Sequence, residues 1–229
     1  MAIIQIKNLE KIYNGSAVQV HAVRGIDLNF EEGEFAAIVG PSGSGKTTFL
    51  NMMGGLDRPT KGEVVINGIN LNDLSNRQLV DFRLNNIGFV FQAYNLIPVL
   101  TAKENVEFIM HLQGLSKEKR DERVNELLNA VGIGDRQKSR PGQLSGGQQQ
   151  RVAVARALAS KPKFILADEP TANLDSKSTE TLLEIMEVLN KEENITFIFS
   201  THDARVVKKA RRVITLVDGQ VESDEVKKG

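Results

Sequence analysis

Residues 40–47 have the sequence Gly40-Pro41-Ser42-Gly43-Ser44-Gly45-Lys46-Thr47, between an apolar run over 35–39 and a helix predicted over 47–53. Glycines at three of these positions leave the backbone unobstructed, so successive N–H groups can turn inward onto phosphate oxygens. The N-terminal end of the following helix adds positive potential at the same place. This pattern is typical of a loop that binds the phosphates of a nucleoside triphosphate, and the alternative is a plain glycine-rich turn.

Two side chains of this loop predict contacts of their own. Lys46 is placed to reach the β- and γ-phosphates, and the Thr47 hydroxyl to bind a Mg²⁺ that bridges them. The loop therefore predicts a nucleotide and Mg²⁺ as ligands. It does not indicate what the nucleotide is used for.

Composition narrows the class of protein. The chain has 229 residues, which favours one domain with lobes. Lys and Arg total 29, as do Asp and Glu, and this balance argues against nucleic acid as a partner because nucleic-acid binders carry basic blocks. The absence of cysteine excludes disulfides and zinc–thiolate sites. No apolar run approaches the ~18 residues of a membrane span and residues 1–7 lack a secretory layout, so we expect a soluble intracellular chain without a span of its own.

The N-terminal part predicts an antiparallel β lobe. Apolar residues alternate weakly over 3–6 and clearly over 22–30, as in strands with one buried face, and residues 13–16 predict a turn between them. A further strand is predicted over 62–66, followed by an Asn-Gly hairpin turn. Tyr13 is either a packing aromatic, the default for a ring near a strand end, or a ring on which adenine stacks.

The middle of the chain predicts a helical lobe. Residues 87–91 predict a short buried strand that ends at Gln92, an apolar segment follows over 95–100, and the sequence up to Ala159 is largely helical. Gly132 is positioned to end one of these helices, which carries an apolar stripe at i, i+3, i+4 and i+7. The stripe consists of Val124, Leu127, Leu128 and Val131.

A second glycine-rich segment, Leu144-Ser145-Gly146-Gly147-Gln148, comes directly before a helix predicted over 149–159. Ser145 is a good N-cap and the glycines expose N–H groups, so the segment predicts a second anion-binding loop; the alternative is a capped helix start with a flexible hinge. One nucleotide does not need two such loops. Either they meet around one phosphate chain within the molecule, or each completes a site with another copy.

The apolar run over 164–167 leads directly into Asp168 and Glu169, as when a buried parallel strand delivers carboxylates to its carboxyl edge. Asp168 suits a Mg²⁺ shell, usually through water, and Glu169 suits a general base for an attacking water. The alternative is an acidic loop after a strand.

The last third predicts two helix–strand pairs and a closing hairpin. Asp175 precedes a helix predicted over 176–191, with Leu182, Met186 and Leu189 on one face, and can simply be its N-cap. His202 follows a strand predicted over 195–199, so we expect it at the same sheet edge as Asp168. We interpret His21 and His111 as structural, predict a hairpin over 213–221, and predict a frayed charged tail over 222–229.

Together, these motifs resemble the nucleotide-binding subunit of ABC transporters over nearly the whole chain. The Leu-Ser-Gly-Gly-Gln pentapeptide is the most specific element because other phosphate-loop ATPases lack it. The segments 55–63 and 95–101 look like the branch that serves lipoprotein release, macrolide export and cell-division complexes. In chain order, the motifs are residues 40–47, Gln92, residues 144–148, Asp168-Glu169, Leu174-Asp175 and His202.

The resemblance implies a fold and its division. The fold would be α/β, a P-loop NTPase core with a mainly parallel central sheet, an N-terminal antiparallel β lobe and an inserted α-helical lobe. Residues 1–229 would form a single ABC ATPase domain, with the core and β lobe at about 1–92 and 162–229 and the helical lobe at about 95–160.

The resemblance also implies residue roles. Tyr13 would stack on adenine, and Thr47 and Gln92 would ligate Mg²⁺, which Asp168 supports through water. Lys46, Glu169 and His202 would be catalytic, with Glu169 polarising the attacking water and His202 contacting the γ-phosphate, while Asp175 communicates across a dimer. The phosphate contacts would be Gly40, Pro41, Ser42, Gly43, Ser44, Gly45, Lys46, Thr47 and Thr48, with Ser145, Gly146, Gly147 and Gln148 from a second copy.

The implied function is ATP hydrolysis that powers a separate integral membrane permease, by closure of a homodimer on ATP and Mg²⁺. The subunit would be cytoplasmic and held at the inner face of the membrane through the permease. Residues 96–100 are either the surface that contacts the permease or a buried loop.

Other classes of protein fit the sequence less well. An ABC ATPase of DNA repair or translation is disfavoured because the chain lacks a long heptad insert and a second motif set. A kinase or GTPase is disfavoured because the chain lacks Asn-Lys-x-Asp. An ATP-gated regulator of an envelope or cell-division complex, without transport, stays an alternative because its motor parts would be the same.

Overall fold

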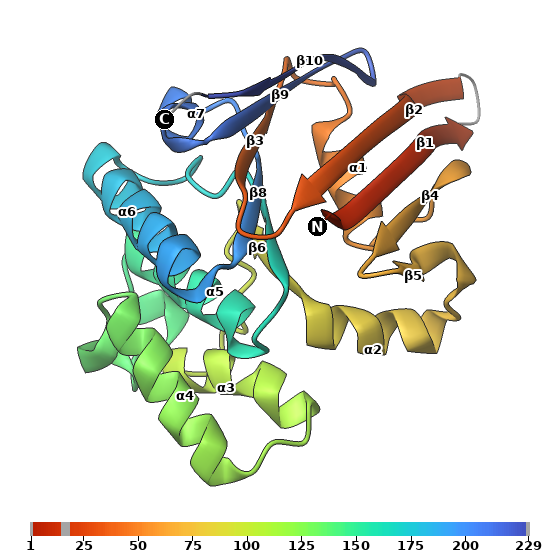
Figure 1. The fold of residues 1–229 in the computed structure, drawn as a ribbon. Coiled ribbons are helices and arrows are strands. Elements are labelled where there is room, and N and C mark those ends of the chain that lie inside the picture. Colours follow the sequence, from red (N-terminus) through yellow and green to blue (C-terminus); the bar gives the residue numbers. More distant parts are fainter. Residues whose placement is uncertain (1, 15–18, 228–229) are drawn as a thin grey trace. The chain divides into compact units, whose positions relative to one another are not determined.

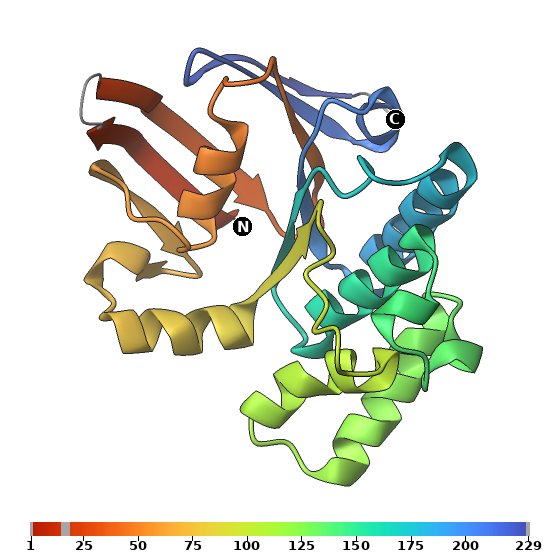
Figure 2. The ribbon, with the colours of Figure 1, turned by 180° about the vertical axis from the view of Figure 1, so that it is seen from behind.

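The computed structural model describes residues 2–14 and 19–227, and the chain divides into two units. The first unit comprises Met1–Arg83 and Thr196–Gly229, and the second comprises Leu84–Ile195. Figure 1 and Figure 2 show the helices and strands of each unit from opposite sides. Helix α2 (Asn76–Asn86) begins in the first unit and ends in the second.

An antiparallel sheet in the first unit confirms the predicted β lobe. It contains β1 (Ala2–Asn14), β2 (Gln19–Glu31), β4 (Lys61–Ile66) and β5 (Ile69–Asn70), in the order β2-β1-β4-β5. Register shifts between β1 and β2 interrupt the alternation, which is why both strands are longer than the pattern predicts. The hairpin turn after β4 has positive φ at Asn67 and Gly68, as predicted. Of the turn predicted over 13–16, residues 15 and 16 lie outside the described residues.

The second sheet of this unit is mainly parallel. Strands β3 (Phe35–Val39), β8 (Thr196–Ser200), β9 (Arg212–Val217) and β10 (Gln220–Val226) lie in the order β10-β9-β3-β8, and β3 is parallel to both of its neighbours. Both strands are buried almost throughout, so β3 is a continuous apolar run and the three central residues of β8 are apolar. Helix α1 (Lys46–Met53) packs against β2 and β8, and α7 (Ala204–Lys209) against β3. The apolar pattern predicts neither α2 nor α7, and α2 buries only Leu79 and Phe82.

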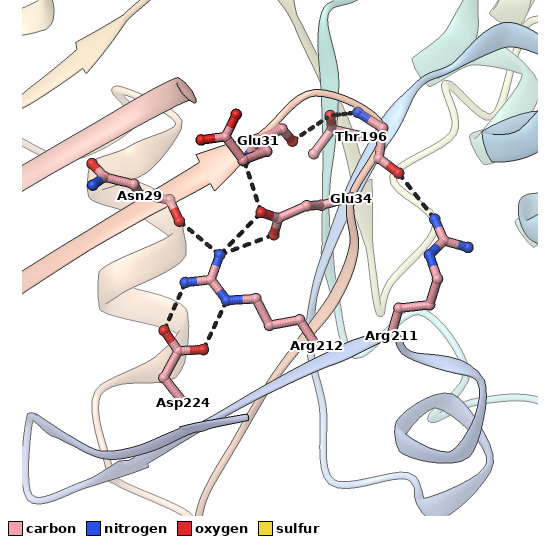
Figure 3. A network of polar contacts seen from close by, with 8 residues as sticks. Asn29, Glu31, Glu34, Thr196, Arg211, Arg212 and Asp224 are labelled. Carbon is pink, nitrogen blue, oxygen red and sulfur yellow. Dashed lines mark hydrogen bonds and ion pairs between the residues drawn. The ribbon is translucent and has the colours of Figure 1, made fainter. Parts of the chain in front are cut away.

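Residues 222–226 correct the prediction of a frayed tail, since they form most of β10 and pair with β9. The guanidinium of Arg212 holds this strand through two hydrogen bonds of 2.7 Å to the carboxylate of Asp224. It also donates to both oxygens of Glu34 and to the carbonyl of Asn29, as Figure 3 shows. The hydrogen bonds to Asp224 raise the pKa of Arg212, and the negative charge of Glu34 adds to this effect. Burial of the guanidinium acts in the opposite direction but does not outweigh them. The tail looks solvated in sequence because its partners lie far away along the chain.

The second unit combines a parallel strand pair with helices. Strand β6 (Ile87–Phe91) pairs with β7 (Phe164–Asp168), and α5 (Gly146–Ala159) packs against β6. Helices α3 (Ala102–Leu112) and α4 (Lys117–Ala130) pack on each other and on α5, and α6 (Ser176–Glu193) also packs on α5. Helix α5 begins at Gly146, three residues before the predicted start, because Ser145 caps it there. The predicted stripe of α4 is buried, and Gly132 ends the helix with a φ of 66°.

Together, the two units confirm the predicted α/β class with an antiparallel N-terminal sheet, mainly parallel strands and a set of helices. The three-residue 3-10 turns are Leu71–Asp73, Gly134–Arg136 and Pro141–Gln143. In the two described ranges of the chain, no helix is both long and apolar enough to cross a membrane.

Candidate functional site

The phosphate loop of the first unit requires glycine at two positions. A Cβ on Gly40, whose φ is 150°, would lie 2.0 Å from the carbonyl oxygen of Leu216. A Cβ on Gly45, whose φ is 96°, would lie 2.2 Å from the carbonyl oxygen of Ala22. A Cβ on Gly43 would meet nothing within 4 Å, so the loop is open there. The backbone is thus packed closely at both ends of the loop and accessible between them.

Lys46 and the start of α1 fit a polyphosphate ligand. The ammonium of Lys46 donates to the carbonyls of Gly40 and Pro41, at 2.8 and 2.9 Å, and so lies against the loop itself. No side chain caps α1 at its N-cap residue Gly45, whereas α3, α5, α6 and α7 are each capped by a side chain. A helix start whose N-cap residue offers no side-chain acceptor suits an anion.

His202 and the phosphate loop share one sheet edge in the first unit. Strands β3 and β8 are parallel, and the N–H of Thr201 donates to the carbonyl of Ile38 at 3.0 Å. Gly40 follows the end of β3, and the exposed His202 follows the end of β8. Both therefore lie at the carboxyl ends of neighbouring strands, where α/β folds place their ligands.

Tyr13 lies near the end of β1 in an arrangement that the sequence does not reveal. Its side chain is 41% exposed, and its hydroxyl donates to Oδ2 of Asp57 at 2.6 Å. The ammonium of Lys11 donates to Oδ1 of Asp57 at 2.6 Å and lies 4.9 Å from the centre of the Tyr13 ring. Burial and the bond to Asp57 raise the pKa of Tyr13, which the Thr48 side chain opposes. The ring is thus held in place by its hydroxyl while part of it stays exposed, and its stacking on adenine stays a prediction.

Asp57 is a residue near the site that sequence reasoning missed. Burial raises its pKa, but hydrogen bonds from Lys11 and Tyr13 outweigh that effect, so its pKa is lowered overall. The sequence signal for Asp57 is its place within residues 55–63, a segment that carries the family resemblance. Its contacts with β1 are not local in the sequence, so no pattern predicts them.

The second unit brings Gln92 and Asp168 to one edge. Phe91 and Asp168 are partners in the register of β6 and β7, and Gln92 follows Phe91 directly. Glu169 has a φ of 46°, a left-handed conformation that few non-glycine residues adopt. This backbone turns the chain sharply after the strand. Such strained residues cluster at functional sites.

The predicted metal ligands form an oxygen-only set. The Thr47 hydroxyl belongs to the first unit, and the Gln92 amide and Asp168 carboxylate belong to the second. Over residues 2–14 and 19–227, no three or more His, Cys, Asp or Glu side chains gather as a metal site. Hydroxyl, amide and carboxylate oxygens are each ligands that Mg²⁺ accepts.

The Ser145–Gln148 segment forms a capping box at the start of α5. The Ser145 hydroxyl accepts from the N–H of Gln148 at 3.3 Å, and the Gln148 side chain accepts from the N–H of Ser145 at 2.9 Å. A Cβ on Gly146 would lie 2.7 Å from the Tyr94 hydroxyl, and one on Gly147 would lie 2.7 Å from the Ser178 hydroxyl. The two glycines thus let the start of α5 approach these side chains closely.

Asp175 is the N-cap of α6, as the simpler interpretation predicts. Its carboxylate accepts from the N–H and the hydroxyl of Ser178, at 2.9 and 2.7 Å. Both hydrogen bonds lower the pKa of Asp175, the one from the N–H more than the one from the hydroxyl. Its role across a dimer stays a prediction.

The segment 96–100 is not a buried loop. None of its residues is buried, and Val99 is 71% exposed. Asn105, which is fully buried in α3, anchors it: its amide oxygen accepts from the N–H of Ile97 at 2.8 Å, and its amide nitrogen donates to the carbonyls of Ile97, Leu100 and Thr101. The segment is therefore an anchored surface loop that presents an apolar side chain.

Comparisons with known proteins agree with these features. A family model described as ABC transporter matches residues 23–172. LolD of Syntrophus aciditrophicus, named a lipoprotein-releasing system ATP-binding protein, is 43% identical over 95% of this chain and 98% of its own length. MacB of Hyphomonas neptunium, named a macrolide export ATP-binding/permease protein, is 46% identical over 97% of this chain, which spans 34% of MacB.

A third relative has a solved structure. MJ0796 of Methanocaldococcus jannaschii, named an uncharacterized ABC transporter ATP-binding protein, is 48% identical over 99% of this chain and 98% of its own length. A dimeric post-hydrolysis state of MJ0796 bound to ADP and Pi matches with a TM-score of 0.91, covering 99% of both chains at 46% identity. This chain therefore belongs to the ABC transporter family, as an ATP-binding ATPase domain of the branch that includes LolD and MacB.

Proposed function

We propose that this chain hydrolyses ATP as a homodimer that closes on two nucleotides and thereby drives a separate membrane permease. The observation that carries this proposal is that the residues proposed to bind ATP and Mg²⁺ lie at the carboxyl ends of strands. One edge of the first unit carries the phosphate loop and His202, and one edge of the second carries Gln92, Asp168 and Glu169. The family membership supports the same assignment.

Each proposed site residue has a task that its chemistry suits. The N–H groups of residues 40–48 and the Lys46 ammonium hold the phosphates, and Tyr13 stacks on the base. Thr47 and Gln92 offer oxygen ligands, and Asp168 orients a metal-bound water. Glu169 accepts the proton of the attacking water while His202 donates to the γ-phosphate. Bound ATP and Mg²⁺ would supply the phosphoryl group and the neutralising charge.

The homodimer accounts for the second glycine-rich segment. The start of α5 and the start of α1 are both positive helix ends, and a triphosphate held between two copies would satisfy one end from each. Residues 145–148 would then contact the nucleotide of the other copy, and Asp175 would lie close to the dimer boundary. The dimeric state of MJ0796 with ADP and Pi supports this arrangement. Hydrolysis followed by release of Pi would remove the charge that holds the copies together.

The permease partner is supported by the names of two relatives. LolD is named as part of a lipoprotein-releasing system, and MacB as an export protein with a permease part. The chain would accordingly act in the cytoplasm, at the inner face of the membrane, through a permease bound at residues 96–100. The anchored loop and the exposed Val99 suit such a contact, since a rigid apolar anchor binds without a large ordering cost.

Val99→Asp is expected to weaken the contact with the permease, because a charge would be desolvated in an apolar contact. About tenfold less permease should then be retained by this chain when it carries an affinity tag. The measurement is the amount of permease subunit that co-purifies from detergent extracts of cells expressing both proteins, followed by an ATPase assay with and without the permease. Val188→Asp is the matched control, since Val188 is an exposed valine on α6. Equal retention by both variants would contradict the docking role of residues 96–100.

Tyr13→Ala is expected to weaken ATP binding by about 1 kcal/mol, which is about fivefold, because the stacking surface is lost. Equilibrium titration with ATP measures the effect. Tyr13→Phe keeps the ring and loses the hydroxyl bond to Asp57, so its affinity should stay closer to that of the wild type. An unchanged affinity in the alanine variant would remove Tyr13 from the base contact.

A further inference from the structure

The loop after Gln92 adopts an unfavourable backbone conformation. Tyr94 and Asn95 have φ values of 26° and 51°, in the left-handed region that a bulky residue such as tyrosine rarely occupies. Arg156 of α5 holds both residues, since its guanidinium donates to the carbonyl of Tyr94 at 2.9 Å and to that of Asn95 at 2.5 Å. Burial lowers the pKa of Arg156. The conformation thus depends on contacts from outside the loop.

Asn173 supplies a second set of contacts to the same loop. Its side-chain amide donates to the carbonyl of Gln92 at 3.0 Å, and its own carbonyl accepts from the Tyr94 hydroxyl at 3.3 Å. The two bonds hold the loop at two separate residues, Gln92 and Tyr94, so they restrain its orientation as well as its position. The Asn173 side chain is otherwise exposed, so a packing role does not account for it.

The segment 169–175 that carries Asn173 is itself a compact turn. The N–H of Ala172 donates to the carbonyl of Glu169 at 3.2 Å, and the N–H of Leu174 donates to that of Thr171 at 3.1 Å. The fully buried Gln150 donates to the carbonyl of Pro170 at 2.8 Å and fixes the turn to α5. Glu169 and Asp175 are the two ends of this turn, and Asn173 lies between them.

We propose that Asn173 is a positioning residue that holds Gln92 in register with Glu169. The inference rests on the proposed function, in which Gln92 offers a metal ligand and Glu169 is the base. Because Asn173 binds the Gln92 carbonyl, the backbone that aims the Gln92 side chain is fixed to the turn that begins at Glu169. Without this bond, the loop is released toward ordinary backbone angles and the two side chains lose their common frame.

The test compares Asn173→Ala with the wild type by two measurements. Amide hydrogen exchange in a peptide spanning residues 92–100 is expected to become faster by about fivefold or more, because the loop opens more often. The kcat for ATP hydrolysis is expected to fall on the order of tenfold, while KM for ATP stays within about twofold, because binding does not depend on this register. Tyr94→Phe removes only the second bond and should shift both measurements less, in the same direction.

Asn72→Ala is the matched control. Asn72 is also an exposed asparagine whose side-chain amide donates to a backbone carbonyl, that of Gly62 at 2.8 Å, in the first unit. Its kcat and its exchange over 92–100 should equal those of the wild type. If Asn173→Ala leaves either the exchange or the kcat at the wild-type level, the inference is overturned. Loss of hydrolysis in Glu169→Gln, measured alongside, would show that the proposed function survives that outcome.

Discussion

Glu169→Gln is expected to slow ATP hydrolysis by ~10²-fold or more and to leave ATP affinity close to that of the wild type. Glutamine has the same shape, but its amide cannot accept the proton of the attacking water. Glu169 directly follows Asp168 at the edge of β7, and its left-handed backbone is maintained by the turn that follows it. The rate is measured as phosphate release at saturating ATP and Mg²⁺, and the affinity by equilibrium titration.

Glu180→Gln provides the control for this change. Glu180 is an exposed carboxylate on α6 in the same unit, and it has no part in the proposed site. Its variant should hydrolyse ATP at the wild-type rate. Wild-type hydrolysis by Glu169→Gln would remove Glu169 from the role of general base, and a large loss of affinity would mean that its charge serves binding instead.

Buried strands and helix caps were predictable because their causes are local. Residues 35–39 and 87–91 coincide with β3 and β6, since apolar runs that are buried on both faces leave a continuous signal. The caps at Ser145 and Asp175 also depend only on residues within one helical turn. Helix α5 begins three residues before the predicted start because the capping box of Ser145 and Gln148 offsets the poor helix propensity of Gly146 and Gly147.

Contacts between distant segments were not predictable. Strand β10 has charged residues that look solvated, yet Arg212 and Asp224 pair across the hairpin and Glu34 joins them. Asp57 and Asn173 are not predictable for the same reason, since each is hydrogen-bonded to a residue more than forty positions away in the sequence, Asp57 to Tyr13 and Asn173 to Gln92. Motif spacing identifies candidate ligands, whereas the residues that orient them become visible only in the folded chain.

Glu169→Gln is also expected to form a stable dimer when ATP is added. The phosphate loop provides one positive helix end without a side-chain cap, and the start of α5 provides a second glycine-rich helix end. A nucleotide held between two copies would contact both helix ends, and slow hydrolysis would preserve the charge that holds the copies together. ADP lacks the γ-phosphate, so the same variant with ADP should stay a monomer. Wild-type protein with ATP should dimerise only until its ATP is consumed.

The central claim is that one copy of this chain carries only part of each hydrolytic site. The most direct test is light scattering on purified Glu169→Gln, with ATP and Mg²⁺ or with ADP and Mg²⁺. The predicted result is a mass of 25.3 kDa with ADP and about twice that mass with ATP. A mass of 25.3 kDa under both conditions, in protein shown by titration to be saturated with ATP, would contradict a site shared between two copies.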